Sequence, residues 1–547
     1  NKEIYEVKIV NKERRIFAKN TIFSYLFSYS DFTFSIFTSL LISRIVSQTI
    51  WGMLILSLSY ISIFSLPLVF LPPSLGLSVN YFIPKYRALE NNGKLRSFIL
   101  KSLILRVIFV IPIFIISILI FSIFLGFFKL FVNQYWYLFF VLSPLILIYG
   151  LDKIIRNMLR ALNLFNVVYY LLILTNIIYI GGLIFSFLFV NFHNVETIAI
   201  IVLLSNLIPF LFSFIYLLVY INIKYDKIDE KKISYKQLVK ELYTYGSGLS
   251  INTYINGFVK EAKVQLIALF DSDIFVTGYY IGLKYANISA ETIRSLNFPL
   301  TNTFTGLYVK KEHEEIEKVY NLMFRYTLFL LLLVTGGLFF LSDFFLSFIY
   351  GHNYLIYSFI LKLLLLAITF NLLGSFFNSM IRATNKIKYI IPYTILTTIV
   401  SLPLYLIGLI LNGIGGALLG LVLGNFINFI ITIILNKILF KIEIKQSKVT
   451  MQYTIFFITI LLVYTLDFLF LKDFNNHLLS LLNLNLFQNF NIFSISLFFI
   501  LYLGCNIIFK VISKEDVENI EIFFQKNNKR NRIILTFLRY LKKLLRK

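Results

Sequence analysis

Cysteine, histidine and charged residues are all scarce in this chain of 547 residues, and each scarcity excludes a class of protein. Cys505 is the only cysteine, so a disulfide framework and a CxxC site are both excluded. The four histidines stand apart from one another, and no metal-ligand spacing occurs. The sequence also lacks the GxxxxGK[ST], GxSxG and HExxH patterns, so neither an ATP motor nor a hydrolase is encoded.

Charged residues make up only 14% of the chain and hydrophobic residues 58%, which excludes a soluble globular protein. About 20 helical residues cross the hydrocarbon of a bilayer, so long apolar runs predict membrane spans. We expect an all-α polytopic membrane protein with about fourteen transmembrane helices. Their approximate limits are 20–44, 52–73, 98–127, 135–155, 167–190, 197–222, 246–270, 275–308, 322–347, 354–380, 389–411, 413–436, 452–471 and 493–511.

The formal net charge of +24 raises the question of nucleic-acid binding, and the placement of the charge answers it. If both termini are cytoplasmic, most of the 51 Lys and Arg residues fall on tails, inward loops and adjoining span ends. The positive-inside rule demands this asymmetry. We therefore expect a multi-pass protein of the cytoplasmic membrane with both termini inside, and no nucleic-acid partner.

The chain repeats itself at half its length. The stretch Met158–Asn163 recurs without a gap as Met380–Asn385, 222 residues later, and each copy lies between long apolar runs. Trp51-Gly52 and Thr277-Gly278 support nearly the same offset. Repeats of this kind are typical of transporters. We predict a cytoplasmic tail, an N-lobe of six helices, a cytoplasmic linker, a C-lobe of six helices, two added helices and a basic cytoplasmic tail, over residues 1–19, 20–222, 223–245, 246–440, 441–513 and 514–547.

Polar and charged residues inside the spans follow single helical faces. A charge at the bilayer centre costs about 2.5–3.5 kcal/mol on insertion scales, so such residues indicate function. Span 246–270 carries Glu261 and a stripe of Asn252, Asn256, Lys260 and Lys263, and span 275–308 carries Lys284, Asn287, Glu291 and Arg294. Span 20–44 has a milder stripe with Asp31 among serines. We expect the three stripes to converge on a water-filled cavity.

These charges have two interpretations. They can be interhelical ion pairs, with Lys260 or Lys263 facing Glu291 and with Glu261 facing Arg294. However, the stripes on spans 246–270 and 275–308 together carry four cations and only two anions. A surplus of positive charge favours an anionic ligand such as phosphate or pyrophosphate.

A few further residues were weighed outside the stripes. Lys362 either reaches outward to the membrane surface or joins the cavity, Asp467 is expected at a membrane boundary, and Gly416, Gly420 and Gly424 are expected to pack helices closely. The segment Arg532–Leu545 alternates apolar and cationic faces, which predicts an amphipathic helix on anionic lipid.

Several short strings, in this order and spacing, resemble one family. They are Lys19-Asn20-Thr21, Leu41-Ile42-Ser43-Arg44 before Trp51-Gly52, Ser74-Leu75-Gly76-Leu77 before Phe82-Ile83-Pro84-Lys85-Tyr86, the two Arg-Ala-x-Asn stretches, Tyr350-Gly351 before Ile360-Leu361-Lys362, and Asn412-Gly413-Ile414-Gly415-Gly416-Ala417. Over most of residues 15–440 the sequence resembles the polysaccharide transporter (Wzx-type, oligosaccharide flippase) family of the multidrug/oligosaccharidyl-lipid/polysaccharide (MOP) exporter superfamily. The usual Gly-Pro between spans 1 and 2 is missing, and the pair expected in span 7 reads Glu261-Ala262-Lys263.

The resemblance implies two six-helix lobes around a central cavity lined by helices 1, 2, 7 and 8. It also implies alternating access that moves a polyprenyl- or dolichyl-pyrophosphate-linked oligosaccharide across the membrane, without enzymatic chemistry or a cofactor. The substrate-binding candidates are Lys260, Lys263, Lys284, Arg294, Asn256, Asn287 and Arg44. Asp31, Glu261 and Glu291 are the candidates for proton or sodium coupling, because burial makes a carboxylate able to exchange an ion.

Other functions remain open at this point. A lipid II-type flippase and a cation-coupled drug exporter belong to the same superfamily, but a drug exporter predicts an anionic or apolar cavity. A membrane glycan polymerase or ligase needs catalytic residues in a sizeable outward loop, and the longest such loop, over residues 472–491, has no such cluster. A scaffold or scramblase subunit leaves the polar stripes without a use.

Overall fold

The structure is a computed structural model, and it describes residues 26–27, 30–73, 75–88, 91–123, 135–189, 194–225, 233–309, 313–384, 386–444, 446–471 and 491–509. Over these residues the protein is helical and has no named strand, only an isolated bridge between Phe70 and Pro73. The predicted all-α class is confirmed. The amphipathic tail over 532–545 and the loop over 472–490 lie outside the described residues.

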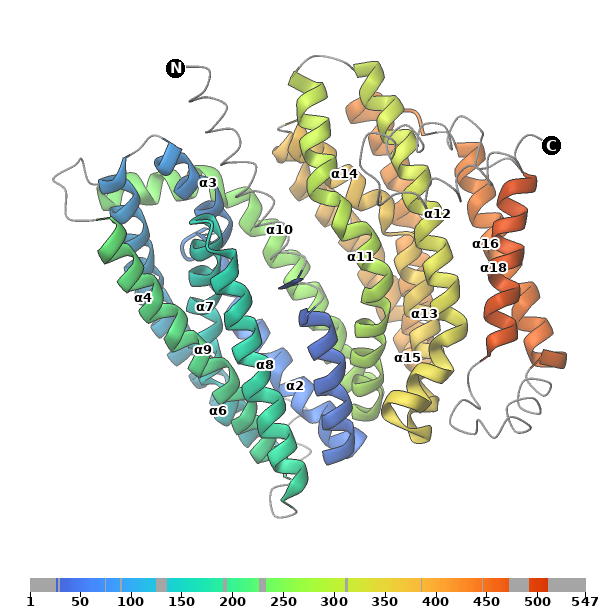
Figure 1. Ribbon diagram of the computed structural model, residues 1–547, viewed down its shortest axis with the longest axis horizontal. Coiled ribbons are helices and arrows are strands. Elements are labelled where there is room, and N and C mark those ends of the chain that lie inside the picture. Colours follow the sequence, from blue (N-terminus) through green and yellow to red (C-terminus); the bar gives the residue numbers. More distant parts are fainter. Residues whose placement is uncertain are drawn as a thin grey trace, which may run out of the picture. The chain divides into compact units, whose positions relative to one another are not determined.

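Every predicted span corresponds to helix in the structure (Figure 1). The first coincides with a helix over 30–45. The others are α2 (Gln48–Ser65), α4 (Asn92–Ile123), α6 (Tyr137–Leu142) with α7 (Pro144–Ala161), α8 (Phe165–Leu188), α9 (Val195–Lys224), α10 (Tyr235–Phe270), α11 (Asp273–Val309), α12 (His313–Phe345), α13 (Ser358–Thr369) with α14 (Leu372–Ala383), α15 (Ile390–Phe440), α16 (Gln446–Leu466) and α18 (Ile492–Ile508).

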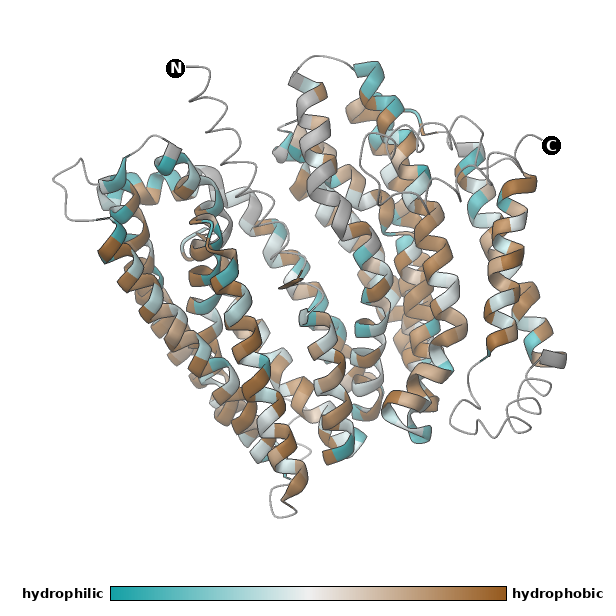
Figure 2. Cartoon of the chain, viewed as in Figure 1, coloured by the Kyte–Doolittle hydropathy of each residue, from teal (hydrophilic) through white to brown (hydrophobic). Residues whose placement is uncertain are grey.

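Within the described residues, nine helical segments are long and apolar enough to cross a membrane, which makes this a multi-pass membrane protein. Helices α10 and α11 do not belong to these nine, although they contain 36 and 37 residues. Their polar stripes lower the hydropathy, and Figure 2 shows α10 with hydrophilic positions along its length where α4 and α9 are mostly hydrophobic. The number fourteen stays a prediction.

Helix α15 is two helices joined at a break, as the two separate predicted spans require. Asn412 and Gly413 have non-helical backbone angles, and Gly413 has φ of +53°. The carboxylate of Asp271, which follows α10, accepts a hydrogen bond from the amide of Ile414 at 2.6 Å and so caps the second helix. Gly408 and Gly416 then let the two halves touch, since a Cβ on either would come to 2.1 Å from the other's carbonyl oxygen. Gly420 meets the Leu404 carbonyl in the same way.

The two copies of the repeated motif end their helices by the same hydrogen bonds. At the end of α7 the amide of Leu164 donates to the Leu159 carbonyl at 2.9 Å, and at the end of α14 the amide of Lys386 donates to the Ile381 carbonyl at 2.9 Å. Asn163 takes the left-handed conformation, φ +65°, that this Schellman ending requires. The repeat therefore encodes a helix stop.

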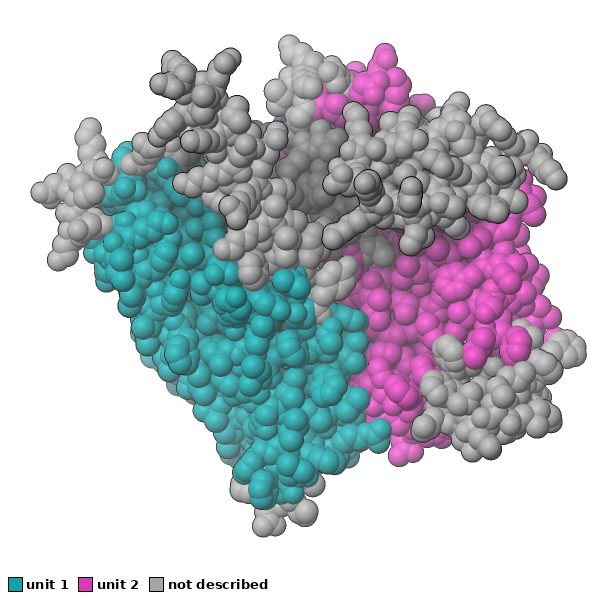
Figure 3. Space-filling model, in the orientation of Figure 1, with its two compact units in different colours: residues 1–284, 387–420 teal, residues 285–386, 421–547 magenta. Residues whose placement is uncertain are grey.

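The chain divides into two compact units, which Figure 3 colours separately. Unit 1 comprises Asn1–Lys284 and Ile387–Gly420, and unit 2 comprises Tyr285–Lys386 and Leu421–Lys547. The predicted six-helix lobes follow a different division of the chain and stay a prediction.

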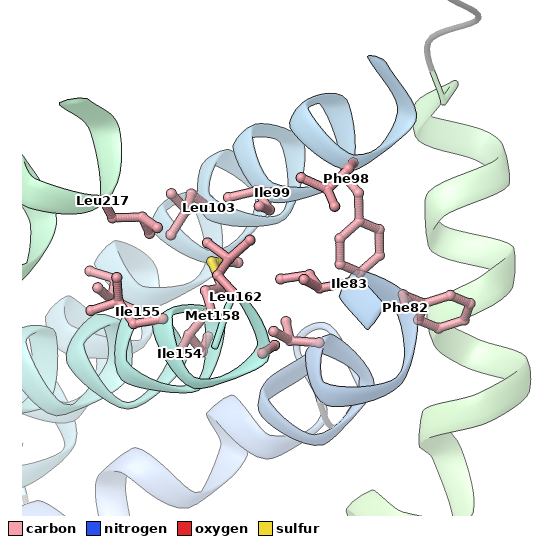
Figure 4. Close-up of a cluster of buried hydrophobic side chains, with 14 of the residues drawn as sticks. Phe82, Ile83, Phe98, Ile99, Leu103, Ile154, Ile155, Met158, Leu162 and Leu217 are labelled. Carbon is pink, nitrogen blue, oxygen red and sulfur yellow. The ribbon is translucent and has the colours of Figure 1, made fainter. Parts of the chain in front are cut away.

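The core of unit 1 gathers around a helix that lies between two of the predicted spans. This helix, α3 (Leu75–Ala88), buries Leu75, Val79, Phe82 and Tyr86 at helical spacing. Figure 4 shows Phe82 and Ile83 beside Phe98 and Ile99 of α4 and the Ile154–Leu162 face of α7. Tyr86 also donates a 2.6 Å hydrogen bond to the carboxylate of Glu241 on α10. Helix α10 thus begins inside the predicted linker and is anchored to α3.

Candidate functional site

In the polar stripe of α10, Asn252 is hydrogen-bonded to a neighbouring helix. Asn252 accepts hydrogen bonds at its side-chain oxygen from Thr394 of α15, at 2.6 Å, and from Asn256, at 3.0 Å. Because Asn252 is satisfied by a neighbouring helix, it positions α10. Asn256 is exposed and donates one amide hydrogen to Asn252.

Lys260 and Lys263 present positive charge from the same helix. The Lys260 ammonium lies 3.4 Å from Glu261, but its side chain is 70% exposed, so the pair contributes little. Lys263 lies over the ring of Tyr405 at 5.6 Å, and the Tyr405 hydroxyl donates to the Lys263 carbonyl at 3.2 Å. Among the described residues of unit 1, no carboxylate pairs with Lys263. The charge on this helix is therefore largely uncompensated.

Lys284 and Asp31 come together from different helices of unit 1. The Lys284 ammonium donates to the Ser35 carbonyl at 3.1 Å and lies 4.5 Å from the centre of the Tyr280 ring. Asp31, one turn before Ser35, interacts electrostatically with Lys284 and with Arg156 of α7. Lys284 of α11 thus contacts the helix over 30–45, and the expected convergence of the three stripes on a cavity stays a prediction.

The remaining candidates lie elsewhere. Arg44 is exposed near the end of its helix. Asn287 and Glu291 belong to unit 2, where Glu291 is exposed. Arg294 is on α11, and its side chain lies outside the described part of the structure. The alternative pairs of Lys260 or Lys263 with Glu291, and of Glu261 with Arg294, stay predictions.

Sequence reasoning missed a second charged pair, on α7. The Arg156 guanidinium donates to Asp152 at 2.6 Å, and the two side chains are only 16% and 15% exposed. Ser213 of α9 also donates to Asp152, at 3.4 Å. The signal was available, because an acid and a base four residues apart at the end of a predicted span are as informative as those on α10.

Arg106 of α4 is a buried cation held by carbonyl oxygens. It is 8% exposed and donates to the Gly150 carbonyl of α7 at 2.9 Å. It also donates to the carbonyls of Leu68 and Leu71, the latter at 2.8 Å, at the short helix η1 (Leu66–Val69) that follows α2. Ser250 of α10 donates to the Val69 carbonyl of the same short helix at 3.2 Å. Arg106 therefore sets the end of α2.

In unit 2, Lys362 has a partner that the sequence analysis did not name. Its ammonium lies 3.1 Å from the carboxylate of Asp343 on α12, and Ser358 also donates to that carboxylate. Lys362 is therefore an ion-paired residue of unit 2. Asp467 accepts hydrogen bonds from Asn491 and Ser494, so it organises the start of α18.

No family model matches the sequence, and no curated protein matches it either. Solved structures do share its fold. An inward-facing multidrug resistance MATE family transporter of the MOP superfamily superposes with a TM-score of 0.63 at 15% identity, over 75% of this chain and 94% of that one.

An outward-facing MATE family transporter of the MOP superfamily superposes with a TM-score of 0.56 at 14% identity, over 78% of this chain and 95% of that one. A point mutant of the Vibrio cholerae MATE transporter VcmN superposes with a TM-score of 0.55 at 13% identity, over 77% of this chain and 94% of that one. The chain therefore has the fold of the MATE transporters.

Proposed function

We propose that this protein is a flippase of the polysaccharide transporter type, which moves a polyprenyl- or dolichyl-pyrophosphate-linked oligosaccharide across the cytoplasmic membrane by alternating access. The fold supports a transporter, because it is shared with MATE transporters in inward- and outward-facing conformations. The substrate class rests on one observation: α10 carries Lys260 and Lys263 with little or no counter-charge. A pyrophosphate supplies the missing negative charge.

In this proposal the pyrophosphate binds at α10 while the lipid tail stays in the bilayer. Lys284 and Asn256 complete the polar surface, and Asn287, Arg294 and Arg44 remain candidates on the same path. Asp31, Glu261 and Glu291 are proposed to couple transport to protons or sodium, since carboxylates in a low-dielectric site bind a proton more readily than in water.

Transport of the labelled lipid-linked oligosaccharide into reconstituted vesicles tests the proposal. Lys263→Gln and Lys260→Gln should slow transport about tenfold or more, because a hydrogen bond to a charged group contributes about 1.5–3 kcal/mol. Lys240→Gln is the matched control, since Lys240 is an exposed lysine on α10 outside the predicted span. If both stripe variants transport at the rate of the control, the pyrophosphate site is refuted.

A multidrug exporter is the second candidate, favoured by the description of a structural neighbour as a multidrug resistance transporter. A cationic drug needs an excess of carboxylates, which α10 does not offer. Efflux of a cationic dye from the same vesicles, unaffected by lipid-linked oligosaccharide, would favour this candidate over the flippase.

A further inference from the structure

Helix α10 lies against the N-terminal helices of unit 1 close to its own first residues. Glu241, in the second turn of α10, accepts the 2.6 Å hydrogen bond from Tyr86 of α3. A Cβ on Gly246 would overlap the carbonyl oxygen of Pro73, which precedes α3, so the two backbones touch where only glycine fits. The first turns of α10 are therefore fixed to α3 and to the residues before it.

The middle of α10 lies against η1, the short helix that follows α2. The buried hydroxyl of Ser250 donates to the Val69 carbonyl at 3.2 Å, and a Cβ on Gly257 would overlap the side chain of Leu66. Arg106 holds this same short helix to α4 and α7. The middle of α10 thus rests on a fixed part of unit 1.

The far end of α10 is attached as well. Just after α10, the carbonyl oxygen of Asp273 would be overlapped by a Cβ on Gly52 of α2, and Thr277 donates to the Gln48 carbonyl at 2.7 Å. From Glu241 to the end of α10 an α-helix rises about 45 Å, more than the about 30 Å of the hydrocarbon. The attachment of α10 therefore extends over the thickness of a membrane.

The first half of α15 follows α10 along the same length. Three hydrogen bonds join the two helices one after another: Asn252 with Thr394 at 2.6 Å, the Lys263 carbonyl with Tyr405 at 3.2 Å, and Asp271 with Ile414 at 2.6 Å. Ile387–Gly420 accordingly belongs to unit 1, although the chain before it, Tyr285–Lys386, belongs to unit 2.

Helix α11 changes from one unit to the other between two successive residues. In unit 1, the Lys284 ammonium donates to the Ser35 carbonyl at 3.1 Å. In unit 2, the hydroxyl of the buried Tyr285 donates to the Leu338 carbonyl of α12 at 2.7 Å. This turn of α11 is therefore a joint between the units.

Alternating access separates two bodies at one end of the surface between them while the other end closes. Contacts that hold both ends and the middle of α10 mark a surface that stays closed. We propose that α10 and the first half of α15 move with the N-terminal helices as one body, so that the moving parts divide inside α11 and α15 and not at the linker over 223–245. This division rests on the proposed alternating access and adds that Lys260 and Lys263 travel with the N-terminal helices.

Distances between spin labels, measured by pulsed electron paramagnetic resonance, test this division in a Cys505→Ala background. Tyr170→Cys on α8 with Lys240→Cys on α10 places both labels in unit 1, whereas Lys240→Cys with Lys318→Cys on α12 places one label in each unit. All three side chains are exposed. On addition of the lipid-linked oligosaccharide, the first distance should stay constant and the second should shift by about 2 Å or more.

A cross-link gives a functional readout. Tyr86→Cys and Glu241→Cys, joined by a short bifunctional thiol reagent that forms reducible disulfides, tie α3 to α10. The cross-linked protein should transport at the rate of the same protein after reduction. Transport that stops on cross-linking and returns on reduction would show that α3 and α10 must separate, which overturns the single body.

Any change in the distance between labels at 170 and 240 also overturns the single body and leaves alternating access intact. Constant distances in both pairs overturn the proposed alternating access as well.

Discussion

Gly52 of α2 lies directly against the backbone of Asp273 at the start of α11: a Cβ at this position would come to 2.1 Å from the Asp273 carbonyl oxygen. Thr277, one turn along α11, donates to the Gln48 carbonyl at 2.7 Å. Trp51-Gly52 and Thr277-Gly278 are the equivalent stretches of the internal repeat. The contact between α2 and α11 therefore lies near the two stretches that the sequence analysis paired.

This contact predicts that Gly52→Ala lowers stability, because the added methyl group meets backbone that cannot move aside. We expect a loss of about 1–3 kcal/mol, as for other overpacked positions. Thermal unfolding in detergent measures it. Gly181→Ala on α8 is the control, since a Cβ there meets no atom within 4 Å. Equal melting temperatures for the two variants would show that α2 and α11 can separate at no cost.

The helix stop at Asn163 gives a second prediction. Arg87 donates to the Ala161 carbonyl at 3.4 Å and, with the Asn163 amide turned toward it, to the Asn163 oxygen at 3.0 Å. Asn163→Ala and Asn163→Gly both lose this acceptor, but only alanine is strained at positive φ. The glycine variant should have a free energy of unfolding about 1 kcal/mol higher than the alanine variant, and therefore the higher melting temperature. The reverse order would contradict the left-handed ending.

The ion pair of Lys362 and Asp343 gives a third prediction. Each single variant, Lys362→Met or Asp343→Asn, leaves a charge without its partner, so both should destabilise the protein. The double variant should lose less stability than the two single variants lose together, by a coupling energy of about 0.5–3 kcal/mol. Denaturation of all four proteins measures it. Single variants that fold normally yet do not transport would instead make Lys362 a residue of the transport path.

Orientation in the membrane is the fourth prediction. In a Cys505→Ala background, a cysteine at Lys236 should be labelled only from the cytoplasm and one at Asn194 only from outside. Both positions are exposed in the structure, at the ends of α10 and α9. A membrane-impermeant maleimide, applied to intact cells and to inverted vesicles, distinguishes the sides. Labelling of both from one side would contradict the predicted topology.

Hydropathy predicted the helices well, because a membrane span needs an apolar run of nearly fixed length. It missed α3, which lies between the predicted spans 52–73 and 98–127. The helix forms because one of its faces is buried against α4 and α7, which no local pattern reveals. The break in α15 was anticipated as the gap between the predicted spans 389–411 and 413–436, whereas its cap, Asp271, follows another helix.

The site was predicted to the level of which helix faces carry charge, and not to the level of partners. Spacing placed Asn252 and Lys260 on one face of α10, but Asn252 pairs with Thr394, far along the chain. Asp343 and Lys362 are separated by a whole helix–helix connection, so only the fold reveals their pairing.

The proposed coupling to protons gives Arg106 a further consequence. A guanidinium keeps its proton at any physiological acidity, so its bonds to Gly150, Leu68 and Leu71 do not depend on the pH on either side of the membrane. A histidine here would have made the end of α2 an acidity sensor. With arginine, the end of α2 does not respond to pH, and the proposed proton coupling is left to the carboxylates.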